Sequence, residues 1–215
     1  MSNPAAATMP DAIYETLRGR ILDQSEEPGT ALTESAVALR FGVARPTAKL
    51  ALERLVADGL LRREAHRAAR VPELTRDDIV DLFGVRRLIE AEATASLARG
   101  GTIPADALDA HRSLLDAARA DGRFAAQDAA FHRALVAGQP SARLARMHAG
   151  LMGEIELCIG QVQAHQLMPA ADVAAQHQAI LDAVTAGDAD GAADLARAHI
   201  DFARAALLAH YDSTH

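Results

Sequence analysis

The chain has 215 residues and a formal net charge of −7 at pH 7. Hydrophobic residues fill 50% of the positions and aromatic residues only 3%, while alanine alone accounts for close to a quarter. Alanine is the best helix former, and a sheet sandwich needs branched and aromatic side chains instead. The length allows one domain or two small ones, so the composition predicts closely packed helices within that limit.

Cysteine content and hydropathy exclude two further classes of protein. The single cysteine, Cys158, excludes an intramolecular disulfide framework and a zinc cluster built from thiolates. No apolar run approaches the roughly 20 residues of a membrane-spanning helix. Residues 1–10 lack the basic and apolar regions of a signal peptide. We therefore expect a protein of the reducing cytoplasm with no membrane partner.

The charge is distributed unevenly along the chain. Residues 1–73 carry ten cationic and ten anionic side chains, whereas residues 74–215 carry twelve and nineteen. Residues 35–71 hold eight cations against three anions. A compact basic segment is typical of a surface that binds a polyanion. Charge alone leaves open the alternative of a solvated helix face followed by a charged loop.

The hydrophobic pattern of the first 73 residues predicts a winged helix-turn-helix. Gly42 suits the left-handed conformation that ends a helix, and Pro46 is tolerated in the first turn of the next one. In chain order, we expect a helix over 11–25, a break at 26–29, a short helix over 33–40, a turn at 41–43, a helix over 45–58, and strands over 60–63 and 69–71.

This arrangement has the chemistry of a DNA-binding surface. Arg45 and Lys49 lie one turn apart at the start of a helix, where an arginine can bind a guanine edge in the major groove. Basic residues of the wing can bind phosphates or the minor groove. The predicted DNA contacts are Arg45, Thr47, Lys49, Arg54, His66, Arg67 and Arg70.

Residues 28–71 resemble the N-terminal domain of GntR-type bacterial transcription regulators. The family pattern is matched by Pro28, Gly29, Leu32, Glu34, Ala38, Gly42, Val43, Arg45, Ala51, Leu52, Leu55, Gly59 and Leu60. The departures are Ala44 for serine, Lys49 for arginine, Leu50 for glutamate and Ala68 for glycine. The resemblance implies a homodimer on an inverted-repeat operator of double-stranded DNA. Because lysine cannot replace arginine at a bidentate contact, we expect an operator that differs from the common one.

The acidic part of the chain reads as helices separated by polar breaks. Thr75 suits a helix N-cap, and Gly100 and Gly101 end the first helix of this part. We predict a mostly α fold with a winged helix-turn-helix over 1–73 and an antiparallel six-helix bundle over 74–215. The six helices are expected over 75–99, 104–120, 123–137, 141–165, 170–186 and 189–208.

Four residues of this bundle form a candidate metal site. Asp128 and His132 share one helix face, and His177 and His199 lie midway along the last two helices. One carboxylate and three imidazoles suit Zn²⁺, Ni²⁺, Mn²⁺ or Fe²⁺. Aspartate and histidine at this spacing are also common by chance, so the spacing leaves open the alternative of hydrogen-bonded core histidines.

The same segment resembles the FCD effector domain of the FadR branch of GntR regulators. The resemblance is carried by "VRRLIEAEATASLA", the Asp-x-x-x-His pair and the two later histidines, and the length favours the shorter, VanR-like subgroup. It implies that Asp128, His132, His177 and His199 bind a divalent metal ion, and that a small carboxylate completes its coordination. A metal that only holds the helices together is the other possibility.

Arg86 has two interpretations of equal weight. It matches a family arginine that points into the effector cavity, where it would bind the carboxylate through two parallel hydrogen bonds. It also stands four residues before Glu90, a spacing that favours an ion pair on one helix face.

The sequence therefore predicts a ligand-responsive transcription regulator and not an enzyme. The alternative is a hydrolase or lyase that uses the metal at Asp128 and the three histidines. Such an enzyme needs a general base near the metal-bound water. No aspartate or glutamate in the pattern is placed for this role, and the basic winged segment would go unexplained.

Overall fold

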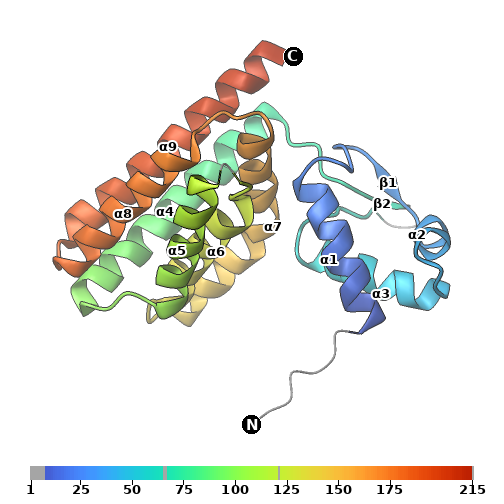
Figure 1. The fold of residues 1–215 in the computed structure, drawn as a ribbon, viewed down its shortest axis with the longest axis horizontal. Helices are drawn as coiled ribbons and strands as arrows, with labels where there is room; N and C mark the ends of the chain where they lie inside the picture. Colours follow the sequence, from blue (N-terminus) through green and yellow to red (C-terminus); the bar gives the residue numbers. More distant parts are fainter. Residues whose placement is uncertain (1–7, 65–66, 121, 215) are drawn as a thin grey trace, which may run out of the picture. The chain divides into compact units, whose positions relative to one another are not determined.

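The computed structural model describes residues 8–64, 67–120 and 122–214, and the chain divides into two units, Met1–Leu74 and Thr75–His215. Figure 1 shows the helices and strands of both units. The elements of the first unit are α1 (Met9–Leu22), β1 (Ala31–Leu32), α2 (Glu34–Phe41), α3 (Arg45–Ala57) and β2 (Ala69–Arg70).

The first unit is a helix-turn-helix that α1 closes on one side. Leu17 and Ile21 of α1 are fully buried, as are Leu52 and Leu55 of α3, because α1 and α2 both pack on α3. The side chain of Thr33 caps α2, and Gly42 ends it with a φ of 64°, as its position predicts. The tight turn that follows therefore sets α3 across α2.

The predicted strand over 60–63 is wrong. Leu60 and Leu61 are both 1% exposed, and their amides donate to the carbonyl of Leu55 at the end of α3. This segment therefore closes the helix instead of alternating between two faces. Only Arg62 reaches the sheet, through an isolated antiparallel bridge to Arg70.

The wing instead contains a strand that the sequence pattern did not indicate. β1 pairs antiparallel with β2, and Ala31 lies opposite Arg70. Two residues are too few to show the alternation by which strands are predicted. The helix expected over 11–25 also differs at its ends from α1 (Met9–Leu22). It begins two residues earlier, after a capping box formed by Thr8 and Asp11.

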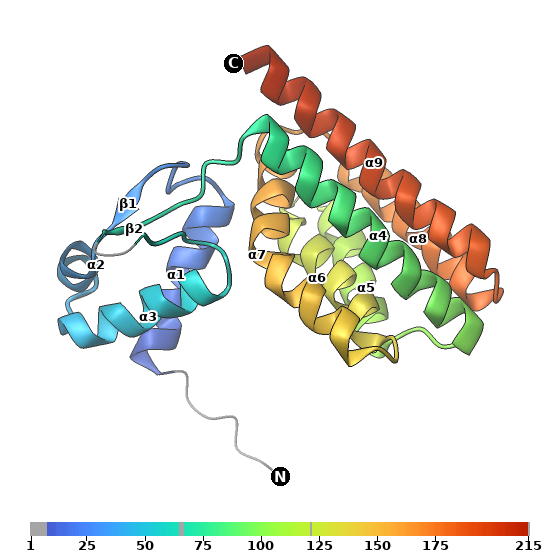
Figure 2. The same cartoon turned by 180° about the vertical axis from the view of Figure 1, so that it is seen from behind.

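The second unit consists, within the described residues, of six helices. α4 and α9 are the two longest of these helices, and Figure 2 shows them running antiparallel along one face of the unit. The predicted mostly α fold is confirmed, although α9 extends beyond the expected residue 208. The bounds are α4 (Arg76–Gly100), α5 (Ala105–Arg119), α6 (Ala125–Gly138), α7 (Ala142–Ala164), α8 (Ala170–Thr185) and α9 (Ala189–Thr214).

The abundance of alanine explains the close contact of α4 and α9. Ala91, Ala95 and Ala193 form one buried cluster between these helices, where larger side chains would hold the backbones apart. Thr75 and Asp78 form a capping box that starts α4, and Gly101 ends it in the left-handed conformation. None of the described helices combines the length and hydropathy needed to cross a bilayer.

Candidate metal centre and nucleic-acid interface

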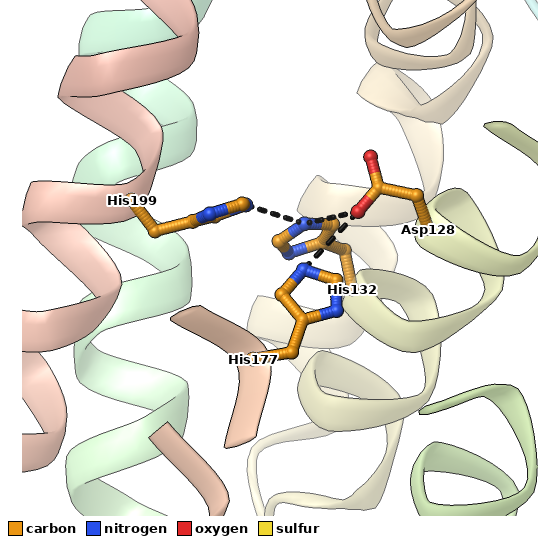
Figure 3. A group of neighbouring side chains, drawn as sticks. All are labelled: Asp128, His132, His177 and His199. Atoms are coloured by element: carbon orange, nitrogen blue, oxygen red, sulfur yellow. Dashed lines mark hydrogen bonds and ion pairs between the residues drawn. The ribbon is translucent and has the colours of Figure 1, made fainter. Parts of the chain in front are cut away.

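The four predicted metal ligands lie together in the second unit. α6 carries Asp128 and His132, α8 carries His177, and α9 carries His199, and Figure 3 shows the four side chains converging. All four residues are buried, and their ligand atoms lie within 4.8 Å of one another. The bundle therefore brings together residues that are separated by up to 71 positions in the chain.

The distances within the cluster fit a bound metal ion. Oδ1 of Asp128 lies 3.1 Å from Nε2 of His177 and 3.4 Å from Nε2 of His132. Nε2 of His132 lies 3.1 Å from Nε2 of His199 (Figure 3). Neighbouring ligands about 2.1 Å from one ion would be separated by about 3.0–3.4 Å. Oδ1 of Asp128 and Nε2 of His177 are buried without a well-aligned hydrogen bond, so they are available to an ion.

The outward nitrogens of two of these histidines each lie close to an oxygen. Nδ1 of His132 lies 2.6 Å from Oε2 of Glu90, and Nδ1 of His199 lies 2.7 Å from Oε1 of Gln176. An oxygen at Nδ1 favours the tautomer whose Nε2 lone pair points at the cluster. The ring of Phe131 stacks on His177 at 3.8 Å between centroids and fixes its plane. The surrounding side chains thus orient the ligand atoms toward one point.

Burial and local charge put most of the cluster in the protonation state that binds a metal. Burial lowers the pKa of His177 to about 4, and burial beside two other imidazoles holds the pKa of His199 well below its usual range. Burial raises the pKa of Asp128, but the nearby imidazoles of His132 and His177 outweigh this and hold it well below normal. Two neutral imidazoles and a carboxylate therefore face the cluster at neutral pH.

His132 differs because it contacts a second carboxylate. Burial lowers its pKa, but the two carboxylates of Glu90 and Asp128 together outweigh burial and raise it. A metal ion at Nε2 would displace that proton and leave Nδ1–H to donate to Glu90.

Glu90 is a residue of this site that the sequence pattern named only as a possible ion-pair partner of Arg86. Its Oε1 lies 2.7 Å from Nε of Arg86 and 3.2 Å from Nε2 of His148, another buried residue that the pattern passed over. Burial raises the pKa of Glu90, but Arg86 and the two histidines hold it well below its usual range. The spacing from Arg86 to Glu90 was the one available signal. Glu90 is fully engaged, so it does not supply the free general base that an enzyme would need.

The contacts of Arg86 agree in part with both interpretations, the ion pair with Glu90 and the contact with an effector. Nε forms the ion pair with Glu90, whereas Nη2 is buried and has no hydrogen-bond partner. The side chain also lines a cavity that reaches Asp128 and His199. The ion pair therefore leaves one edge of the guanidinium available to a ligand in the cavity.

The predicted DNA contacts in the first half of α3 differ from one another in exposure. Arg45 and Lys49 are exposed in the first half of the helix, and Thr47 is half-buried between them. Lys49 lies 3.5 Å from Glu53 in an exposed pair, which is weak enough for a phosphate or base to replace. Ala44 precedes the helix and provides no side-chain cap.

The remaining predicted contacts have partners within the first unit. Nη1 of Arg54 lies 3.0 Å from Asp11, and its guanidinium lies 3.7 Å from the Tyr14 ring, which gives it a structural role. Arg67 pairs with Glu64 at the surface, and Nη1 of Arg70 donates to the Gly29 carbonyl at 2.8 Å. His66 lies outside the described residues.

Two family models match the chain, one for each unit. The model described as "Bacterial regulatory proteins, gntR family" matches residues 10–71, and the FCD domain model matches residues 81–202. The first match covers the helix-turn-helix and wing. The second contains all four residues of the Asp/His cluster.

Curated relatives carry regulator names. The transcriptional regulator BphR of Paraburkholderia xenovorans (strain LB400) is 27% identical over 202 residues, which are 89% of this chain and 82% of that protein. A protein of Escherichia coli (strain K12) named as an L-lactate dehydrogenase operon regulatory protein is 28% identical over 216 residues, 89% of this chain and 83% of the relative. These relatives are regulators and not enzymes.

Solved structures show the same fold. A GntR regulator from Rhodococcus sp. RHA1 superposes with a TM-score of 0.78 at 23% identity, covering 94% of this chain and 98% of that one. McbR/YncC of E. coli superposes with a TM-score of 0.74 at 18% identity, covering 96% and 100%. At these identities the likeness concerns the fold alone.

Proposed function

The chain belongs to the GntR family of bacterial transcription regulators and carries an FCD domain, and from this premise we propose that it represses or activates transcription in response to a small carboxylate. The carboxylate would bind at a divalent metal ion in the second unit. The observation that carries this proposal is the buried convergence of Asp128, His132, His177 and His199 beside a cavity lined by Arg86.

The donor set suits Zn²⁺, Ni²⁺, Mn²⁺ or Fe²⁺, because imidazole and carboxylate ligate all four. When bound, the ion would supply a Lewis acid with positions open to the effector. Arg86 would hold the same carboxylate through its free Nη2 edge. A metal with only a structural role would instead stabilise the unit without changing its response to a carboxylate.

We propose that α3 reads the operator in the major groove. Arg45 and Lys49 are the exposed cations in the first half of this helix and would contact bases, with Thr47 beside them. Arg54, His66, Arg67 and Arg70 remain predicted contacts, and those of the wing would bind phosphates and set the register. Because the operator would lie on the bacterial chromosome, we propose that the protein acts in the cytoplasm.

Homodimers would bind an inverted-repeat operator. Leu88 of α4 and Phe202 of α9 are 69% and 50% exposed, and each directly follows in the chain one residue of the ion pair between Arg87 and Asp201 that joins these helices. Figure 2 shows the two helices side by side on one face of the unit. Large exposed apolar side chains on neighbouring helices favour a self-complementary contact. Effector binding would then shift the balance between arrangements of the dimer.

Selection of genomic fragments by the purified protein tests the DNA-binding part. We expect enrichment of a short inverted repeat, and binding that weakens steeply with salt. Arg45→Ala should abolish selective binding while the helical content and metal content stay unchanged. Arg146→Ala removes one exposed cation from the second unit and is the matched control. Full operator binding by Arg45→Ala would contradict the assignment of α3.

The same operator then tests the sensing part. Carboxylates are added to the complex of the metal-loaded protein with a fluorescent operator. Fluorescence anisotropy then measures whether the protein releases the operator or binds it more tightly. Removal of the metal with a chelator should abolish the response. A response that survives complete metal removal would show that the ion is structural.

A further inference from the structure

Leu50 is exposed on the helix that the proposed function places in the major groove. Its side chain is 56% exposed, whereas Leu52 and Leu55 of the same helix are fully buried. Single exposed leucines are common on protein surfaces, so only the position of Leu50 can indicate a role. It is the sixth of the thirteen residues of α3, and therefore lies in the half of the helix that contacts base edges in helix-turn-helix proteins.

The exposed side of α3 combines this leucine with charged neighbours. Leu50 stands four residues after Pro46 and three before Glu53, a spacing that puts these exposed residues on one side of the helix. Lys49 directly precedes Leu50 and lies 3.5 Å from Glu53. An apolar protein surface that covered Leu50 would also have to remove water from this ion pair. A DNA groove instead offers phosphates and polar base edges to the charges that surround an apolar contact.

Thymine is the base whose major-groove edge suits a leucine. It presents a methyl group at C5, and a leucine against this methyl group removes apolar surface of both from water. Cytosine and adenine present an amino group and guanine presents acceptor atoms, and each would lose a hydrogen bond to water against leucine without gaining another. A leucine at a base edge therefore attracts one base and penalises the other three.

We propose that Leu50 selects thymine at one position of each operator half-site by contact with the 5-methyl group. This inference rests on the proposed function, because it specifies a base that the same helix reads. Arg45 and Lys49 supply hydrogen bonds and charge, whereas Leu50 adds a contact that depends on a methyl group alone.

Selection from a random library of DNA duplexes locates the thymine. The intact chain should select a thymine in each half-site, and Leu50→Ala should lose the preference at that position alone. Leu50→Glu should replace the thymine by cytosine, because a carboxylate accepts a hydrogen bond from the cytosine amino group. Leu39→Ala is the matched control, since it removes an 86% exposed leucine from α2 and should keep the thymine.

Deoxyuridine then tests the methyl contact directly, because it lacks the methyl group of thymine and keeps its base pairing. In a duplex of the selected sequence, deoxyuridine at this position of one half-site should weaken binding by the parent protein about fourfold, the effect of one buried methyl group. The same replacement should leave binding by Leu50→Ala unchanged. Fluorescence anisotropy measures these affinities, and circular dichroism checks that the variants keep their helical content.

Four outcomes would overturn the inference. Retention of the thymine by Leu50→Ala or Leu50→Glu, or an equal effect of deoxyuridine on the parent protein and Leu50→Ala, would assign the methyl group to another residue. No effect of deoxyuridine at any thymine of the half-site would exclude a methyl contact. Loss of the preference in Leu39→Ala as well would assign it to the packing of the first unit. An unchanged preference together with a changed sedimentation coefficient in Leu50→Ala would place a second copy of the chain on this leucine.

Arg45→Ala separates this inference from the proposed function. If Arg45→Ala abolishes selection while deoxyuridine has no effect on the parent protein, α3 reads the operator without Leu50, and only the inference fails. If the parent protein selects no sequence from the library, the DNA-binding part of the proposed function fails together with the inference.

Discussion

At the scale of single residues, Glu90 connects the candidate effector contact to the candidate metal ligand. One oxygen of this carboxylate faces Arg86 and His148, and the other faces Nδ1 of His132. Carboxylates behind ligand histidines fix the tautomer and raise the basicity of the ring. A carboxylate bound by Arg86 would therefore be linked to the metal ligand through one intervening side chain.

Glu90→Gln should weaken metal binding while preserving the volume of the side chain. We expect a loss of about 10–100-fold in affinity for Zn²⁺, the usual effect of removing such a partner. Competition with a chromophoric chelator measures it. Glu92→Gln changes an exposed glutamate on the same helix and should have no effect. Unchanged affinity in Glu90→Gln would show that the carboxylate only neutralises Arg86.

At the scale of elements, Glu26 holds two helices of the first unit together. Its Oε1 accepts hydrogen bonds from Arg20 of α1 at 2.8 Å and from Arg40 of α2 at 2.6 Å. Burial raises the pKa of Glu26, but these two arginines outweigh it and lower the pKa below its usual value. The ionised carboxylate is thus favoured by folding. Its stabilising effect is complete above the pKa of the unfolded chain and is lost as the pH falls through the lowered folded value.

Glu26→Gln should therefore destabilise the first unit at neutral pH and not in acid. Removing the charge-assisted hydrogen bonds should cost about 1–3 kcal/mol at pH 7. Urea unfolding across a pH series should show the variant and the parent protein converging toward pH 3. The neighbouring, exposed Glu27→Gln provides the control. A pH-independent difference would assign the effect to packing and not to charge.

A substitution at the start of α3 should raise the stability of the first unit, whereas Glu26→Gln lowers it. Ala44 is the N-cap of this helix and makes no side-chain hydrogen bond, whereas Thr33 caps α2 with its hydroxyl. Ala44→Ser should stabilise the first unit by about 1 kcal/mol, since serine satisfies a free amide of the first turn. Thermal unfolding measures the gain, and Ala57→Ser at the other end of the helix should show none. An unchanged or lower midpoint would mean that the backbone at this position cannot orient the hydroxyl.

The helices could be predicted from the sequence, whereas the sheet and the surroundings of the ligands could not. Caps such as Thr75 and stops such as Gly42 act locally, so the pattern carries them. The pairing of β1 with β2 depends on contacts between residues nearly 40 positions apart. The position of Glu90 beside His132 likewise depends on how α4 packs against α6, which no local spacing records.

The sequence also nominated four candidate metal ligands but did not show that they meet. Their residue types and the family resemblance nominated Asp128 and the three histidines. Helix packing alone determines that their donor atoms lie within 4.8 Å of one another. The sequence points to Gln176 only through its position directly before His177. The structure shows that it accepts a hydrogen bond from His199. The VanR-like subgroup stays a prediction, with which six described helices in the second unit agree.

At the scale of the whole molecule, the proposed dimer depends on the exposed face of α4 and α9. Leu88→Glu places a charge on the exposed part of α4 and should convert the proposed dimer to a monomer, because a buried unpaired carboxylate strongly opposes association. Sedimentation velocity at micromolar concentration measures the change. The α3 surface and the metal site are untouched, so the variant should keep its helical content and metal affinity.

The affinity for the operator is a second measurement that tests whether Leu88→Glu disrupts the dimer. A monomer holds one half-site, so Leu88→Glu should lose at least 100-fold in affinity for the full inverted repeat, whereas its affinity for a single half-site should equal that of the parent protein. Leu108→Glu introduces the same charge at an exposed leucine of α5, away from this face, and should remain dimeric. A dimeric Leu88→Glu would exclude this face as the interface, and a monomeric Leu108→Glu would move the interface to α5. The two variants therefore locate the contact through which a ligand in the second unit could act on the spacing of two DNA-binding helices.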